Sequence, residues 1–471
     1  MSVAGVIASF MSFMSVATGQ LPPGPAVLPR CGSPAEVATL ERHDALDLWT
    51  MRLVNGVVVR CRAMETDGYR IVASIGLEPG DEAMAGAVAA GWNAGEVGCD
   101  DATLDREALR GFLDVWRLEL RATHAPDALR LEVKSDWFIS VAPACELLSL
   151  MLLEPRLDAS SIATWREERL ALSGVDQEDT VSVFWRAWDR AAMPEGARRF
   201  GPMDRDELAS IDVASVRAWL RTRLASAPIE ITMAGEVNAL LDYRAVFDPF
   251  RVSLGGLEAR PVPTPDRRSA WRLDPRPKGP IEIVQRASRG PALVAVGFHA
   301  PSGDDLRDPA KHDEFRRMVM AMEVLSERLP KALREAGVEA RLEQSRPVYY
   351  EARSGVAATG VMWAIAGGAA GSSGPAAEAM WRTIDELART GPTPEELDAA
   401  VAAQEAVRAA DGEPVRVWST ILDGADGRGL SLDRVASLSQ AMRSVTPEEV
   451  RDALRAWTAP SRRFTVRVEP E

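Results

Sequence analysis

The chain repeats itself, and this repeat constrains the fold more than any other feature. EPRLDASSIATWREERLAL and TGPTPEELDAAVAAQEAVRAA each give a short turn, an N-cap residue and a long amphipathic helix. ASIDVASVRAWLRTRLASAPIEITMAGEV and RSVTPEEVRDALRAWTAPSRRFTVRVEPE each give an N-cap, a helix, a short break and an alternating strand. The N-caps are offset by 235 residues (Asp158 to Thr393) and by 234 residues (Asp212 to Thr446). The shared offset indicates an internal duplication.

The beginnings of the two halves agree more loosely. GVVVRCRAMETDGYRIVASIGLEPGDE and GPIEIVQRASRGPALVAVGFHAPSGDD each predict two strands joined by a hairpin, then a loop and a helix. Hairpins and short strands that alternate with helices favour antiparallel pairing. We therefore predict an α+β fold of two tandem homologous αβ domains, each a mainly antiparallel sheet with helices packed on one face.

Proline-rich stretches suggest where the chain divides. Six prolines in residues 254–280 forbid a continuous helix and favour an extended connector. We predict a signal-like segment and flexible tether over residues 1–40, and a first αβ domain over residues 41–250. A Pro-rich linker over residues 251–280 and a second αβ domain over residues 281–471 complete the division.

The first residues predict export. MSVAGVIASFMSFMSVATGQLPPG has an apolar stretch of signal-peptide length and a small-residue cleavage pattern that ends at Ala17, although Lys and Arg are missing before it. We expect a periplasmic or otherwise exported protein, or a cytoplasmic one if this segment is not a signal peptide. The stretch is too short to predict a stable membrane span.

Charge and cysteine content exclude several classes of protein. The net charge of −14 argues against nucleic acid as the main partner. Cys31, Cys61, Cys99 and Cys145 include no CxxC pair, which argues against a zinc ribbon or a thioredoxin-like site. Their spacing leaves open whether they are free thiols or form one or two disulfides.

No local motif supplies a catalytic or metal-binding site. Zinc requires three or four ligands that converge on one point, and no two of the four histidines lie within five residues of each other (His43, His124, His299 and His312). The Gly-rich GGAAGSSGP is interpreted as a strand-to-helix connector, with phosphate binding by its backbone amides as the alternative. We predict no catalytic, metal-binding or cofactor-binding residue, and no cofactor.

The order of the motifs resembles the pitrilysin/insulinase metallopeptidases, which include the mitochondrial processing peptidase subunits and the core proteins of the respiratory cytochrome bc complex. The stretches that carry the resemblance are MRLVNGVVVRCR, LLSLMLLEPRLDASSIATWREERL and ELASIDVASVRAWLRTRLASAPIEITMAGEV. The resemblance spans residues 46–471, and it implies the LuxS/pitrilysin-like metallohydrolase fold with tandem αβ domains.

The resemblance also shows a departure from the family pattern. Active members carry HxxEH on the helix that here reads AMAGAVAAGWNAG, so the motif would fall at residues 86–90 or 89–93, where this chain has neither His nor Glu. The third zinc ligand of the family would fall near Glu167 or Glu168, and a lone carboxylate does not hold zinc. In the second half LREAGVEARLEQS keeps Arg334 but lacks the Tyr that contacts substrate in active members.

These departures predict a protein that is not an enzyme. We expect a catalytically inactive homologue, the non-catalytic subunit of a heterodimer with an active, HxxEH-bearing peptidase, which together enclose a peptide substrate. The alternative is a structural or peptide-binding protein without a protease partner.

Overall fold

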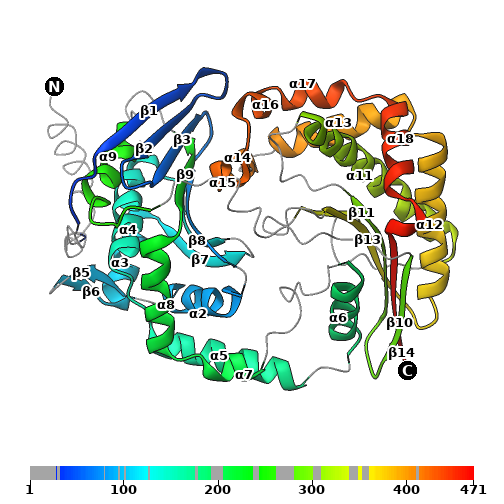
Figure 1. The fold of residues 1–471 in the computed structure, drawn as a ribbon, viewed down its shortest axis with the longest axis horizontal. Helices are drawn as coiled ribbons and strands as arrows, with labels where there is room; N and C mark the ends of the chain where they lie inside the picture. The colour runs from blue at the N-terminus through cyan, green and yellow to red at the C-terminus, as the bar shows by residue number, and fades with distance from the viewer. Residues whose placement is uncertain are drawn as a thin grey trace, which may run out of the picture.

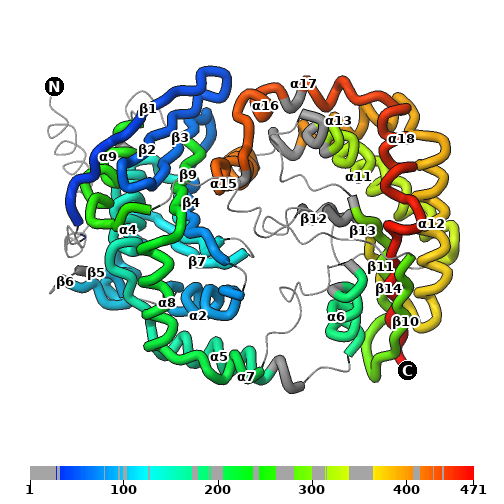
Figure 2. Tube along the Cα trace, in the orientation of Figure 1, coloured from blue at the N-terminus to red at the C-terminus, as the bar shows by residue number. Residues whose placement is uncertain are grey.

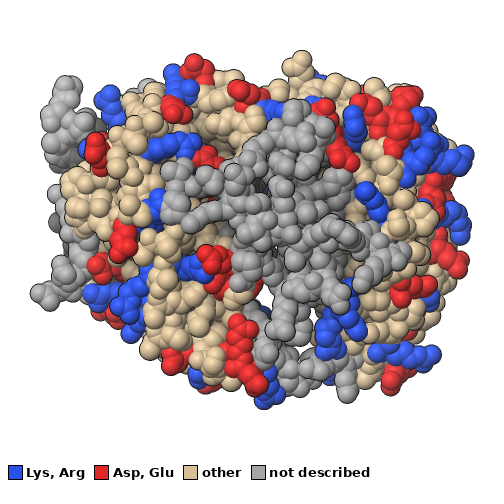
Figure 3. All heavy atoms as spheres, in the orientation of Figure 1, with Lys and Arg blue, Asp and Glu red and all other residues tan. Residues whose placement is uncertain are grey.

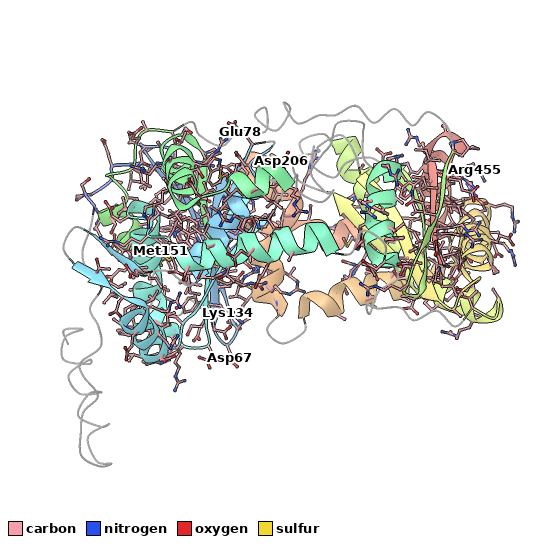
Figure 4. The ribbon with its side chains drawn as sticks, turned by 90° about the horizontal axis from the view of Figure 1, so that it is seen from below. Asp67, Glu78, Lys134, Met151, Asp206 and Arg455 are labelled. Atoms are coloured by element: carbon pink, nitrogen blue, oxygen red, sulfur yellow. The ribbon has the colours of Figure 1, made fainter. Side chains whose placement is uncertain are left out.

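The computed structural model of the protein describes residues 28, 32–78, 80–93, 96–99, 102–125, 128–175, 179–192, 205–236, 243–260, 280–300, 309–338, 348–352, 360–409 and 413–471. The signal-like stretch up to residue 27 and the Pro-rich residues 261–279 lie outside this part of the chain. Two αβ halves lie side by side, the N-terminal half on the left and the C-terminal half on the right (Figure 1). Seen from below, the halves are separate masses of packed side chains, with Met151 and Lys134 in one and Arg455 in the other (Figure 4).

The first half is built on a seven-stranded sheet with the order β1-β2-β3-β9-β4-β8-β7. Its strands are β1 (Val37–His43), β2 (Leu48–Leu53), β3 (Val58–Met64), β4 (Tyr69–Gly76), β7 (Glu119–Ala125), β8 (Ala128–Ser135) and β9 (Ile229–Glu236), with a separate hairpin of β5 (Val97–Cys99) and β6 (Ala102–Leu104). Its helices are α2 (Glu82–Asn93), α3 (Arg106–Trp116), α4 (Val141–Leu153), α5 (Ala159–Val175), α6 (Thr180–Ala192), α7 (Arg205–Ser210), α8 (Val213–Ser226) and α9 (Arg244–Ser253).

The second half is built on a five-stranded sheet with the order β10-β14-β11-β13-β12. Its strands are β10 (Ile281–Ala287), β11 (Ala292–Ala300), β12 (Val348–Ala352), β13 (Gly360–Gly368) and β14 (Arg463–Pro470). Its helices are α11 (Pro309–Glu335), α12 (Ser373–Thr390), α13 (Pro394–Ala409), α14 (Glu413–Leu422), α15 (Ala425–Arg428), α16 (Leu432–Ala436), α17 (Leu438–Arg443) and α18 (Pro447–Trp457).

The two sheets share one topology, which confirms the α+β class and the antiparallel bias. In each sheet one parallel pair (β3 with β9, β10 with β14) interrupts an otherwise antiparallel ladder. The predicted hairpins are wrong in both halves, because the last strand of each half inserts between the two strands that were expected to pair. β9 pairs with β3 and with β4, and β14 pairs with β10 and with β11. A short connection does not force neighbours in sequence to pair, and the inserted strand gains two ladders of backbone hydrogen bonds.

The repeated helix starts are confirmed by their caps. Asp158 accepts a hydrogen bond from the Ser161 amide at 2.8 Å ahead of α5, and Thr393 accepts one at 3.3 Å ahead of α13. Asp212 and Thr446 form reciprocal capping boxes at the starts of α8 and α18. Each cap satisfies backbone donors that have no partner inside its helix. The matching positions of the caps show that α5 corresponds to α13 and that α8 corresponds to α18.

One face of each sheet carries the main core. In the first half α2, α4 and α8 contribute to a core with the buried side chains of β3, β4, β8 and β9. In the second half α11, α12 and α18 do the same over β11 and β13. Helices therefore cover this face of each sheet as predicted.

The opposite face of each sheet is covered by a helix from the other half. α6 belongs to the first half in sequence, but it packs on β10, β11 and β14, where the green helix lies beside the strands of the second half in Figure 2. Phe184 and Trp188 are fully buried there against Leu293 and Phe464. Burying side chains of this size contributes on the order of 2–3 kcal/mol each.

The reciprocal contact combines an apolar cluster, in which Leu46 and Leu48 pack with Leu422 and Val435, with a set of buried polar contacts. α14 packs on β4 and β9 of the first sheet, and the adjoining α15 lies at the same face (Figure 1). The Arg60 guanidinium is 1% exposed and lies 2.6 Å from the Glu230 carboxylate on the neighbouring strand. It also pairs with Asp426 of α15, which in turn pairs with Arg52. Glu230 accepts the Gly427 amide at 3.1 Å, so its second oxygen is satisfied by the other half as well.

A second set of polar contacts extends this interface toward β8. Asp423, which follows α14, accepts a hydrogen bond from Ser74 and lies 2.6 Å from Arg130. Arg70 donates to the Ser419 hydroxyl of α14 at 2.9 Å. The first sheet therefore presents arginines to α14 and α15, and these two helical segments supply carboxylates and hydroxyls.

We expect Arg60→Met to destabilise the protein by about 3–5 kcal/mol, because it leaves the buried Glu230 without its charge partner. The measurement is urea unfolding of the full chain. The double variant Arg60→Met/Glu230→Gln removes the unpaired charge, while Asp426 keeps Arg52, so it should be clearly more stable than the single variant. Equal losses in the two variants would contradict this account of the interface.

The same interface predicts acid lability. Burial raises the pKa of Asp426, but the charges of Arg60 and Arg52 and their hydrogen bonds outweigh burial and leave that pKa lowered. A lowered folded-state pKa stabilises the protein above the unfolded value of about 3.9, and this stability is lost as the pH falls through the folded pKa.

We therefore expect Asp426→Asn to lower the melting temperature at pH 7 and to flatten the loss of stability below about pH 4. Thermal melts between pH 3 and pH 7 measure both effects. The matched control is Asp398→Asn, on an exposed position of α13, which should leave the fall of the melting temperature below about pH 4 unchanged. If Asp426→Asn also left this fall unchanged, the role of the Asp426 carboxylate would be refuted.

Candidate functional site

The helix without ionisable residues at its centre is α2, and it is packed tightly on both sides. It contacts β7 at the edge of the first sheet and α5 behind it. Its buried positions are Ala83, Ala85, Gly86, Ala87, Val88, Ala89, Gly91 and Trp92. Small residues let the helix approach both neighbours closely, and no buried charge has to be compensated.

Gly86 is the tightest point of this packing. A Cβ built on it would lie 2.7 Å from Cζ2 of Trp165 and 3.4 Å from Cε1 of His124. The Trp165 indole comes from α5, and the imidazole comes from β7. The space beside this turn of α2 is therefore filled by two rings from neighbouring elements.

Neither register of the family motif fits a metal. In the register of residues 86–90 the first ligand would start at Gly86, where the indole leaves no room for a side chain. In the register of residues 89–93 the Glu position of the motif is Trp92, which is 1% exposed in the core, and the last position is Asn93. No group of three or more His, Cys, Asp or Glu side chains that could hold a metal ion exists within the described ranges.

The carboxylates suggested for the third ligand lie on the exposed side of α5. Glu167 and Glu168 are both exposed, whereas Trp165 of the same helix faces α2. His124 is mostly buried, and burial together with the nearby Arg169 charge lowers its pKa. The position therefore brings together an indole, a neutral imidazole and a guanidinium rather than a set of zinc ligands.

Asn93 has a role that its sequence position did not suggest. Its side-chain amide donates to the Ala122 carbonyl at 2.9 Å and accepts the Ala122 amide at 2.6 Å. Ala122 lies on β7, the last strand of the first sheet. One side chain thus occupies both outward-facing backbone groups of an edge residue, as a neighbouring strand would. A polar residue at the end of an apolar helix was the only signal for it.

The Gly-rich connector between β13 and α12 binds an internal anion. The amides of Gly371 and Ser373 donate to the Glu469 carboxylate at 2.7 and 3.0 Å. Burial raises the pKa of Glu469, but these hydrogen bonds outweigh it and the pKa is lowered. The carboxylate takes the amides that the phosphate-binding alternative would need, in keeping with the interpretation of this stretch as a connector.

The remaining residues singled out in the sequence are dispersed. Arg334 is exposed in the last turn of α11, and residues 339–347 after it lie outside the described ranges. Cys61 and Cys145 are both buried, and burial raises the pKa of the Cys145 thiol. The Cys31 position and the Cys99 side chain fall outside the described part of the structure.

The surface carries both signs of charge. On the face shown in Figure 3, acidic and basic side chains are interspersed over both halves. Within the described residues, none of the helices has the length and apolar character that a bilayer span requires.

Comparison with known proteins identifies the fold. No family profile matches the sequence, and no curated protein matches it significantly. A protease from Helicobacter pylori has a TM-score of 0.70 at 14% identity, over 92% of this chain and 100% of that one. A peptidase M16 inactive domain from Pseudomonas fluorescens has a TM-score of 0.70 at 16% identity, over 90% of this chain and 99% of that one.

A longer protein shares the fold as well. The periplasmic protease PqqL from Escherichia coli has a TM-score of 0.69 at 14% identity, over 100% of this chain and 51% of that one. This chain therefore spans about half of PqqL. The chain has the pitrilysin-type fold of the M16 peptidases, as its motifs predict, and at these identities the likeness establishes the fold alone.

We expect Gly86→His to destabilise the protein by about 1–3 kcal/mol, because the new side chain has to displace the Trp165 indole. Urea unfolding in the wild-type and Trp165→Ala backgrounds measures the coupling between the two positions. The loss caused by Gly86→His should shrink to less than half in the Trp165→Ala background. The same loss in both backgrounds would show that Trp165 does not fill this space.

Proposed function

We propose that this chain is a non-catalytic member of the M16 peptidase group. The observation that carries the proposal is the Trp165 indole, which lies against Gly86 in the space where a zinc-binding side chain would extend. Loss of a ligand alone could leave an open pocket, but here the Trp165 indole of α5 fills that space. The exposed Glu167 and Glu168 lie on the same helix without facing α2.

We further propose that the chain pairs with an active, HxxEH-bearing homologue and helps to enclose a peptide. The chain already consists of two αβ halves that lie side by side (Figure 1). PqqL is about twice as long as this chain, so a second unit of similar size would bring the total to that length. In such a pair the partner would supply the zinc chemistry, and this chain would form part of the wall that encloses the peptide.

Two observations support the proposal of a location outside the cytoplasm. Its first residues have the composition of a signal peptide, and PqqL is named as a periplasmic protease. We propose a periplasmic location and the domain division predicted from the sequence, with the first domain over residues 41–250 and the second over residues 281–471. The first strand β1 begins at Val37, and residues up to Arg260 pack on the first half.

We expect the purified chain to hold far less than one zinc ion per molecule and to leave a peptide pool uncleaved, because the position on α2 offers no ligand set. Metal analysis and mass spectrometry of the peptide pool measure these results. Stoichiometric zinc together with cleavage by the chain alone would refute the proposal.

Pull-down of the tagged chain from its native cells tests the pairing. Recovery of an HxxEH-bearing homologue, with peptidase activity in the pair, supports the subunit role. Retention of peptides with no such homologue would favour the alternative, a peptide-binding protein without a protease partner. The matched control bait is a chain that carries Arg60→Met, whose inter-half contact is weakened.

A further inference from the structure

The outer edge of the second sheet differs from its counterpart in the first. Val284 of β10 pairs with Arg467, and Cys61 of β3 pairs with Met233. Met233 and Arg467 are one repeat of 234 residues apart, so β10 corresponds to β3. In the first sheet β2 pairs with β3 in antiparallel fashion, with Trp49 opposite Cys61. No described strand occupies that place beside β10.

The side chains of β10 alternate between two environments. Ile281 and Ile283 pack against the cluster that α6 forms on the second sheet. Glu282, Val284 and Arg286 are exposed on the opposite face, and Val284 is 55% exposed. An apolar residue on an open strand edge invites another strand to pair with it, unless the edge is protected.

The exposed residues of β10 are complementary to themselves. If a second copy of β10 runs antiparallel with Val284 opposite Val284, each Glu282 lies opposite an Arg286 on the same face. Such a pair has one apolar contact on its axis and two ion pairs around it, all of which favour cross-strand association. Within the described part of its own chain, Glu282 makes a long ion pair, 3.7 Å from Arg467.

A groove of about 880 Å³ lies on the face of the sheet next to this edge, between β14 and α12, and Glu282, Trp381, Arg382 and Arg467 are among its lining residues. The corresponding place in the first half holds the antiparallel strand β2. The fold therefore accommodates an antiparallel strand at this position of the sheet.

Two other described edges, those of β7 and β1, fit a second copy less well. On β7 the outward groups of Ala122 are already bonded to Asn93. On β1, pairing about Leu40 sets Ala38 opposite Arg42, whose charge already pairs with Asp44 and Asp47 of its own chain. The sequence of β10 matches itself better than either of these two edges.

We propose that two copies of this chain associate through β10, around a two-fold axis that passes between the two Val284 residues. The two five-stranded sheets then join into one continuous sheet, and the contact is closed, so it yields a dimer and not a filament. This association uses the edge of the second sheet and does not depend on the proposed role in peptide processing.

Sedimentation equilibrium of the full chain up to about 100 µM, well above the micromolar range of weak complexes, tests the proposal. The wild type should form a dimer. Glu282→Arg and Arg286→Glu each place like charges opposite one another twice, so each should weaken the dimer at least about tenfold. An equimolar mixture of the two variants restores opposite charges at both positions and should dimerise again. Asp398→Arg, on exposed α13, is the matched control and should behave as the wild type.

Disulfide trapping gives a second readout that does not require charge changes. Val284→Cys should form a linked dimer under mild oxidation, because directly opposite Cβ atoms lie about 5 Å apart. Val115→Cys, on an exposed position of α3, should not. A monomeric wild type over the whole range, no rescue in the mixture, or oligomers that grow beyond dimers would each overturn the proposal.

Discussion

The buried charge cluster of Arg60, Glu230 and Asp426 is the constraint on which the rest of the structure depends. A guanidinium that is 1% exposed is tolerated only when carboxylates neutralise it. One carboxylate comes from the neighbouring strand and the other from α15 of the second half. The first sheet therefore completes its polar face only when the second half closes on it. In turn, α6 of the first half packs its apolar side chains on the second sheet. Each half therefore depends on the other.

The core of the first half fixes where α2 lies. The main core of the first sheet holds α2 between β7 and α5, and the small residues of the helix allow both neighbours to close on it. Once Trp165 and His124 fill the space beside Gly86, the packing no longer has room for a ligand of the size of His. The same closeness lets Asn93 reach the backbone of Ala122 and complete a strand edge. Loss of metal ligands and gain of packing are thus two aspects of one helix position.

Most of the architecture could be predicted because it depends on local patterns in the sequence. The N-caps at Asp158, Asp212, Thr393 and Thr446 mark helix starts through short-range hydrogen bonds, and their constant offset shows the duplication. The strand order could not be predicted in this way. β9 and β14 insert between strands that are close in sequence, and the choice depends on partners more than 150 residues away. The contact of Trp165 with Gly86 likewise joins two different helices, and no rule of residue spacing predicts it.

The sequence by itself determined the repeat, the α+β class and the lack of His or Glu at residues 86–93, where the family motif would fall. These properties depend on residue identity and on periods of two, of 3.6 and of about half the chain. Only the tertiary structure decided that the halves exchange helices, that an indole occupies the place of a ligand, and that β10 is left as an open edge. Each of these features depends on which distant surfaces come into contact. A buried charge or a filled cavity affects stability only after that contact has formed.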